Sequence, residues 1–265
     1  MKKFGVKLWS RDFAKNPEFA NQSVAAVKEG YFDYIELFVL PDSYNEFYQK
    51  IADEFKGIKV LIHAPHSVFG LDTGNEERFA QNCEDLKASQ QYADLLHSEI
   101  IILHPGFNAQ EKYLAETIRQ FTAINDSRLT VENLPYLCTA TGKYLHGTSP
   151  QQIKQIMDES GCRFCLDFSH AICAANSYKR DKIADLRAYQ ELKPVMYHLC
   201  DGDWSSSRDE HRHYGEGNYP LAKLLNEYTD DNTYITMETG MTKPTVIQPW
   251  LDDIRYLKSL LKNII

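Results

Sequence analysis

The stretch TSPQQIKQIMDESGCRFCLDFSHA, residues 148–171, contains a helix signal followed directly by a strand signal. Ser149 is a favoured N-cap residue, Pro150 suits the first helical position, and Gly161 follows the last residue of the helical pattern. The apolar run at 163–168 then predicts a buried strand. A helix that leads at once into a buried strand is typical of an α/β fold.

The same alternation extends along the rest of the chain. Short apolar or β-branched runs predict eight strands, at residues 4–9, 33–40, 58–63, 98–104, 128–133, 163–168, 195–199 and 233–238. Between them, apolar residues recur every three or four positions in segments that include 16–30, 43–57, 75–97 and 115–124. Successive right-handed crossovers place every helix on the same outer face, so we predict one parallel (β/α)8 TIM barrel, a single domain over residues 1–265. A doubly wound open sheet is the rival topology.

The composition is that of an ordinary folded protein, with 43% hydrophobic and 25% charged residues. No run of eighteen uncharged apolar residues is present, and the first residues lack the apolar segment of a signal peptide. We therefore expect a cytoplasmic protein with no membrane contact, and we predict no protein partner. The six cysteines are scattered, which suits reduced thiols, and the Cys162–Cys165 pair has no second pair with which to form a zinc or redox site.

The formal net charge of −8 gives no general attraction to nucleic acid, because phosphate binding normally requires lysine and arginine. This argues against non-specific DNA binding. It is weaker evidence against a site that meets phosphate through bound cations, whose charge the sequence does not count.

Metal-competent side chains follow six consecutive predicted strands. In a parallel barrel the chemistry lies at the C-terminal ends of the strands, and these ends carry His63, His104, Glu132, Asp167 with His170 just beyond, His198, Glu238, and, in the loop at 208–217, Asp209 and His211. One histidine there is commonly structural, and one carboxylate commonly caps a helix. Several carboxylates in one barrel mouth would repel one another unless cations neutralise them. Imidazole and carboxylate ligands suit zinc, manganese, iron or cobalt, and the histidine content favours zinc.

These residues, in this order, carry a resemblance to a known family. The fragments HAP at 63–65, HPG at 104–106, VEN at 131–133, CLDFSHA at 165–171, HL at 198–199, DEHRHYGEG at 209–217 and ME at 237–238 resemble the endonuclease IV family of class II AP endonucleases, within the xylose-isomerase-like TIM barrel superfamily. The resemblance covers residues 60 to 240 approximately, and it implies nine zinc ligands. His63 and His104 would hold one ion, which Glu132 would bridge to a second. Asp167, His198 and Glu238 would complete the second ion, and His170, Asp209 and His211 would hold the third. We expect two to three Zn2+ ions, with Mn2+ as the alternative metal.

The resemblance implies a phosphodiesterase that cleaves DNA 5′ to an abasic site, with an attacking water made acidic by zinc. Four cations in predicted loops near the strand ends, Arg11, Lys143, Arg180 and Arg208, would contact phosphates or else be ordinary surface charge. The segment at 66–70, HSVFG, departs from the family because it lacks the expected tyrosine and asparagine. This departure concerns the substrate rather than the metal centre.

The sugar isomerases and epimerases of the same superfamily provide a second reading. In that reading one divalent ion polarises a ketose or a sugar phosphate, and Glu132 and Glu238 move a proton between carbons. Glu36 would bind a sugar hydroxyl or else pair with a neighbouring strand, and the apolar wall would be formed by Trp9, Phe38, Phe69 and Trp204, which are otherwise core-rim aromatics. A single ion does not need all nine candidate ligands, so the full set favours the phosphodiesterase. A metal-binding protein without catalysis is the third alternative.

Overall fold

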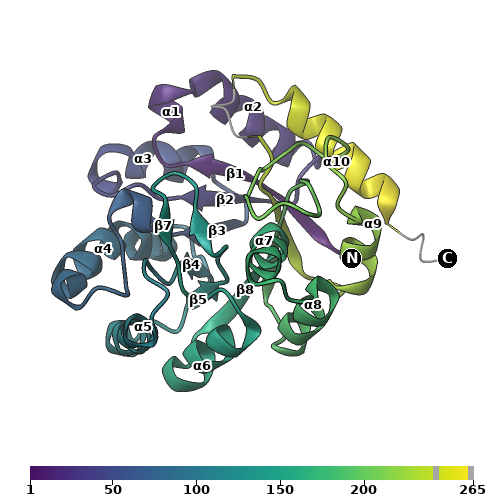
Figure 1. The fold of residues 1–265 in the computed structure, drawn as a ribbon. Helices are drawn as coiled ribbons and strands as arrows, with labels where there is room; N and C mark the ends of the chain where they lie inside the picture. Colours follow the sequence, from purple (N-terminus) through teal and green to yellow (C-terminus); the bar gives the residue numbers. More distant parts are fainter. Residues whose placement is uncertain (241–244, 262–265) are drawn as a thin grey trace.

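Eight parallel strands form a closed barrel. The structure is a computed structural model that describes residues 1–240 and 245–261. The strand order is β1-β10-β9-β8-β5-β4-β3-β2, which confirms the predicted TIM barrel and rules out the open sheet (Figure 1). The strands are β1 (Lys3–Trp9), β2 (Tyr34–Phe38), β3 (Val60–His63), β4 (Ile101–Leu103), β5 (Leu129–Glu132), β8 (Arg163–Asp167), β9 (Met196–Leu199) and β10 (Tyr234–Met237).

Helices surround the barrel on its outer face, as the right-handed crossovers require (Figure 1). They are α1 (Asp12–Lys15), α2 (Pro17–Lys28), α3 (Tyr44–Glu54), α4 (Phe79–Leu95), α5 (Glu111–Ile124), α6 (Pro150–Ser160), α7 (Phe168–Tyr178), α8 (Lys182–Glu191), α9 (Leu221–Glu227) and α10 (Gln248–Leu260). Two 3-10 turns, η1 (Ser67–Phe69) and η2 (Glu76–Arg78), lie between β3 and α4. None of the helices in the described ranges is long and apolar enough to cross a membrane.

The local signals around α6 act as predicted. The Ser149 side chain accepts a hydrogen bond from the backbone N–H of Gln152, and Pro150 begins the helix. Gly161 ends it with a φ of 73°, a left-handed conformation that costs glycine little. The strand that follows ends at Asp167, one residue earlier than predicted, because Asp167 caps α7 by accepting the backbone N–H of His170 at 2.7 Å.

Side chains fill the barrel interior in layers, because alternate residues of each strand point inward. The lower layer is mostly apolar and consists of Tyr34, Leu61, Ile100, Ile102, Cys165 and Met196. Gly5 makes room for it, since a Cβ at this position would lie 2.3 Å from the Tyr34 ring. The next inward positions toward the C-terminal end carry the candidate ligands. The strand register places Lys7 beside Glu36 and Asp167 beside His198.

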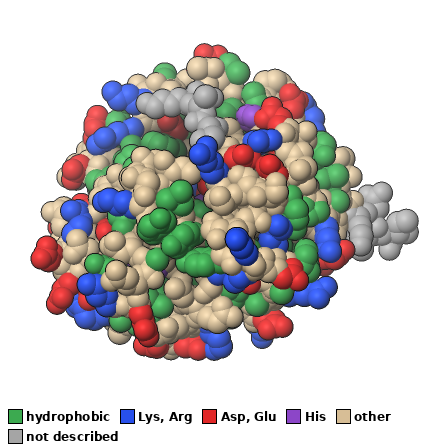
Figure 2. Space-filling model, viewed as in Figure 1, with side chains coloured by type: hydrophobic (Ala, Val, Ile, Leu, Met, Phe, Trp, Pro, Cys, Tyr) green, Lys and Arg blue, Asp and Glu red, His purple; other side chains and the backbone are tan. Residues whose placement is uncertain are grey.

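A small hairpin lies in the long loop after β5. Its strands, β6 (Leu137–Cys138) and β7 (Lys143–Tyr144), are only two residues long and were not predicted from the sequence. Phe107, Leu134 and Leu145 form a separate apolar cluster that packs the base of the hairpin. Figure 2, in the same view as Figure 1, shows hydrophobic side chains gathered near the middle of this face, with basic side chains beside them.

Candidate metal centre

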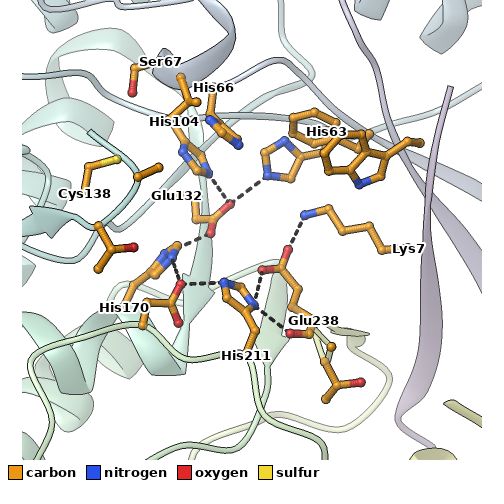
Figure 3. Close-up of a pocket in the computed structure, with 18 of the residues that line it drawn as sticks. Lys7, His63, His66, Ser67, His104, Glu132, Cys138, His170, His211 and Glu238 are labelled. Atoms are coloured by element: carbon orange, nitrogen blue, oxygen red, sulfur yellow. Dashed lines mark hydrogen bonds and ion pairs between the residues drawn. The ribbon is translucent and has the colours of Figure 1, made fainter. Parts of the chain in front are cut away.

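Glu132 lies at the centre of the inward-facing polar layer (Figure 3). One carboxylate oxygen, Oε2, lies 3.1 Å from His104 Nε2 and 3.3 Å from His63 Nε2. The other, Oε1, lies 3.2 Å from His170 Nδ1 and 3.3 Å from His198 Nδ1. The single carboxylate at the end of β5 therefore joins histidines from four other strand ends.

The first group of ligand atoms, which we call the His63 cluster, consists of His63, His104 and Glu132. His63 Nδ1 donates to the carbonyl oxygen of Ala64 at 2.7 Å, which leaves the lone pair of Nε2 directed at Glu132. Zinc bonds of 2.0–2.2 Å give neighbouring tetrahedral ligands a separation of about 3.3 Å. The 3.1 and 3.3 Å separations in this cluster match that value.

The second group, the His170 cluster, consists of His170, Asp209 and His211. Asp209 Oδ2 lies 3.3 Å from His170 Nε2 and 2.6 Å from His211 Nε2. In both histidines Nδ1 meets a backbone carbonyl, that of Asn133 at 2.9 Å for His170 and that of Glu238 at 2.7 Å for His211. Both Nε2 atoms are thereby directed at one carboxylate oxygen. A contact from Nδ1 to a carbonyl oxygen, which leaves Nε2 free for the metal, is usual in metal-binding histidines.

A third group, the Lys7 cluster, consists of Lys7, Glu36, His198 and Glu238. The Lys7 ammonium contacts Glu238 Oε1 and lies 3.1 Å from Glu36 Oε1. Glu36 is fully buried, and its Oε2 lies 2.8 Å from His198 Nε2 and accepts a hydrogen bond from the Thr236 hydroxyl at 2.6 Å. Lys7 was not predicted as a site residue. Glu36 lies too deep for the predicted contact with a sugar and instead pairs with neighbouring strands.

Two buried atoms test whether this layer fits a metal ion. Glu132 Oε1 and His198 Nδ1 lie 3.3 Å apart, and neither has a hydrogen-bond partner among the described residues. Two buried polar atoms placed in this way need a proton or a cation between them. The layer therefore needs positive charge beside Glu132, and the separations of 3.1 and 3.3 Å in the His63 cluster fit a bound metal ion.

The pKa values of the ligands reflect this crowding. Burial alone would lower the pKa of His211, but Asp209, together with Glu238 and Asp167, raises the pKa to about 9. Burial lowers the pKa of His104 to about 4, and burial raises the pKa of Asp167 to about 7. Binding of a divalent ion would displace protons from the groups that hold them, since metal ligands must be deprotonated.

The four expected ligands of the middle ion are divided between two sets of neighbouring atoms. Asp167 shares one set with Glu132 and His170, whereas His198 and Glu238 share another with Glu36 and His63. Cys165, to which the sequence pattern assigned no role, lies close to Glu132 and His198. Burial raises the pKa of the Cys165 thiol to about 12, which disfavours the thiolate that metal binding needs.

A cavity of about 730 Å³ opens above the three clusters. Trp9 and Phe38 line one side of it, as predicted for an apolar wall, and Phe69 packs against both rings. The placement of Trp204 at the mouth was wrong. Its ring packs against Tyr219 and Lys182, because Asn176 on α7 donates a hydrogen bond to its carbonyl oxygen and holds the loop away from the mouth.

The four predicted phosphate-binding cations have different surroundings. Arg11 lines the main cavity, together with Lys15, which was not predicted. Arg208 lines a second cavity of about 430 Å³ beside the hairpin. Arg180 is committed to Asp185 and the Thr148 carbonyl, each at 2.7 Å, so its role is structural. Lys143 lies over the Phe107 ring.

Comparison with known proteins places the chain in a family. A model described as "Xylose isomerase-like TIM barrel" matches residues 24–260. The chain belongs to the xylose isomerase-like TIM barrel family. One curated relative, named "Probable endonuclease 4", from Metamycoplasma arthritidis, is 27% identical over 230 residues, and the match covers 81% of each chain. The resemblance inferred from the motifs is thereby confirmed.

Solved structures with a similar fold include both kinds of enzyme considered from the sequence. Endonuclease IV from Thermus thermophilus is 20% identical, with a TM-score of 0.67 over 97% of this chain and 98% of that one. D-allulose 3-epimerase from a Methylomonas species, in complex with D-allulose, is 13% identical, with a TM-score of 0.69 over 98% and 97%. At these identities the likeness establishes the fold, and the activity has to be argued from the site.

Proposed function

We propose that the protein is a metal-dependent phosphodiesterase that hydrolyses DNA 5′ to abasic sites. The observation that carries the proposal is the double use of Glu132. Its Oε2 faces the His63 cluster, and its Oε1 faces His170 and His198, so one carboxylate joins separate ligand groups. An enzyme that transfers a proton on a sugar at a single ion would need only one of the two ligand clusters, the His63 cluster or the His170 cluster.

The chain's own residues would fix the geometry of the reaction. Bound divalent ions would supply an acidified water as the nucleophile and would neutralise charge on the phosphate oxygens. Glu132 would hold one ion together with His63 and His104, and Asp209 would hold another together with His170 and His211. Backbone carbonyls lock three of the histidines in position before substrate binds, which reduces the reorganisation needed in the reaction.

The cavity suits a deoxyribose flipped out of a DNA duplex, with its flanking phosphates. Apolar rings at Trp9 and Phe38 would cover the sugar from which the base is missing, and Arg11 and Lys15 on the rim would meet the phosphates. These two cations offset locally the acidic charge of the whole chain.

A sugar epimerase is the second candidate, and one observation favours it. Glu132 and Glu238 both line the cavity and come from strand ends three positions apart in the eight-stranded barrel, so that both can face one bound sugar. The curated endonuclease relative and the two histidine clusters outside this pair weigh toward the phosphodiesterase.

The two candidates separate in one experiment. The zinc-loaded protein is incubated with an end-labelled duplex that contains one tetrahydrofuran abasic analogue, and in parallel with a panel of ketoses. We expect incision on the 5′ side of the analogue, leaving a 3′-hydroxyl, with no cleavage of the undamaged duplex and no cleavage after chelation. Interconversion of a ketose without any incision would overturn the proposal in favour of the epimerase.

A further inference from the structure

We infer that Lys7 permanently supplies the positive charge that a third divalent ion would supply at Glu238, so that the chain binds two ions. Lys7 is then a positioning residue, because it acts through the carboxylates and not on a reacting atom. The inference rests on the metal centre of the proposed function, and it concerns the number of ions rather than the substrate.

The position of the ammonium supports this assignment. Lys7 extends from β1 between Glu36 and Glu238, and it contacts the same Glu238 oxygen, Oε1, that lies 3.1 Å from His198 Nδ1 (Figure 3). An ion held by Glu238 and His198 would have to bind this oxygen at about 2.0–2.2 Å. The ammonium already occupies the space beside it, and two cations on one buried oxygen would repel each other.

Both carboxylate oxygens of Glu36, one of the partners of Lys7, already have contacts. Glu36 Oε1 faces Lys7, while its Oε2 faces His198 Nε2 and the Thr236 hydroxyl. Glu36 is completely buried and lies in register with Lys7 on the neighbouring strand. The lysine and this glutamate therefore form a fixed pair inside the barrel, which holds the ammonium against Glu238, one of the expected ligands of the middle ion.

The charges of the inner layer balance with two ions. Five carboxylates take part in the ligand groups: Glu36, Glu132, Asp167, Asp209 and Glu238. One lysine ammonium and two divalent ions match these five charges when all five carboxylates are ionised and the histidines are neutral. A third divalent ion would leave an excess of two positive charges in a buried layer, and such an excess is costly without further anions.

The other two sites do not involve the lysine. The His63 and His170 clusters are complete with three ligands each and leave positions open for water or phosphate, as catalytic zinc sites do. We therefore place the two ions in these clusters. The His198 and Glu238 side chains serve the lysine pair instead.

The experiment counts ions in the purified full-length chain. Wild type, Lys7→Met and Lys3→Met are equilibrated with excess zinc, freed of loosely bound metal by gel filtration, and analysed for zinc per chain by elemental mass spectrometry. Methionine keeps the length of the lysine side chain but not its charge. Lys3 is the matched control, because it lies on the same strand at the opposite end, with its ammonium over the Tyr234 ring.

We expect two zinc ions in wild type and in Lys3→Met, and three in Lys7→Met, since the freed Glu238 and Glu36 can then share an ion with His198. The double variant Lys7→Met/Glu238→Gln should return to two. Three ions in wild type would overturn the inference while leaving the proposed function intact. Two ions in a folded Lys7→Met protein, judged by circular dichroism, would also overturn it. If Lys7→Met does not fold, the wild-type count alone decides.

Discussion

Replacement of Glu132 by glutamine tests the role of the central carboxylate directly. The change keeps the shape of the side chain but removes one negative charge that lies 3.1–3.3 Å from four histidines. It also puts an amide NH2 where one oxygen was, so that only one ligand group keeps an oxygen. Unit charges 4 Å apart at an effective dielectric of 20 attract by about 4 kcal/mol. Loss of that attraction corresponds to a fall in zinc affinity of about 1,000-fold.

Competition with a chromogenic chelator measures that affinity, and elemental analysis counts the ions. We expect at least one ion fewer than in wild type and a loss of activity of about 1,000-fold or more on whichever substrate the wild type uses. Glu54→Gln is the control, because Glu54 is a surface carboxylate paired with Lys50, far from the barrel interior. If Glu132→Gln retained both the wild-type ion count and the wild-type rate, the role of Glu132 as a metal ligand would be refuted.

Three further outcomes follow from the structure. Removal of the metal by chelation should lower the melting temperature by about 5–10 °C, because a ligand at 100 times its Kd adds about 2.7 kcal/mol to the free energy of unfolding. A melting temperature that does not rise when zinc is added back would contradict a metal centre. Burial lowers the pKa of His146 from its ordinary 6.5 to about 4. As the pH falls from 6.5 to 4, His146 is therefore protonated in the unfolded chain but not in the folded one. The free energy of unfolding of the wild type should fall by up to about 3 kcal/mol over this range. Chemical denaturation should show a shallower loss for His146→Asn over this range, and equal slopes would contradict the assignment. Gly217→Ala should lower the free energy of unfolding by about 2 kcal/mol or more in the same assay, because a Cβ at this position would lie 2.4 Å from Asp201 Oδ1 and from the backbone oxygen of Gly202. A variant as stable as the wild type would mean that the loop can shift.

The strand ends were predictable because two regularities coincide. Strand side chains alternate with a period of two, and a parallel barrel brings every C-terminal strand end to one mouth. His63 and Glu132 are the last residues of their strands, and His104 and Glu238 follow theirs directly. Convergence of these side chains therefore follows from their positions along the chain, without any knowledge of contacts.

The role of Lys7 was not predictable in this way. A lysine in the first strand has the same pattern as an ordinary rim charge, and its partners come from β2 and from the residue after β10, more than 200 positions away in the second case. Only the closure of β1 against β10 brings Lys7 to Glu238. The hairpin escaped prediction for a different reason, since strands of two residues show no alternation.

Anomalous X-ray diffraction at the zinc edge, from crystals grown with zinc, tests the metal centre most directly. We predict one peak within about 2.2 Å of Glu132 Oε2, between His63 and His104, and a second at the same distance from Asp209 Oδ2, between His170 and His211. Fully ordered clusters with no anomalous density between these side chains would contradict the account.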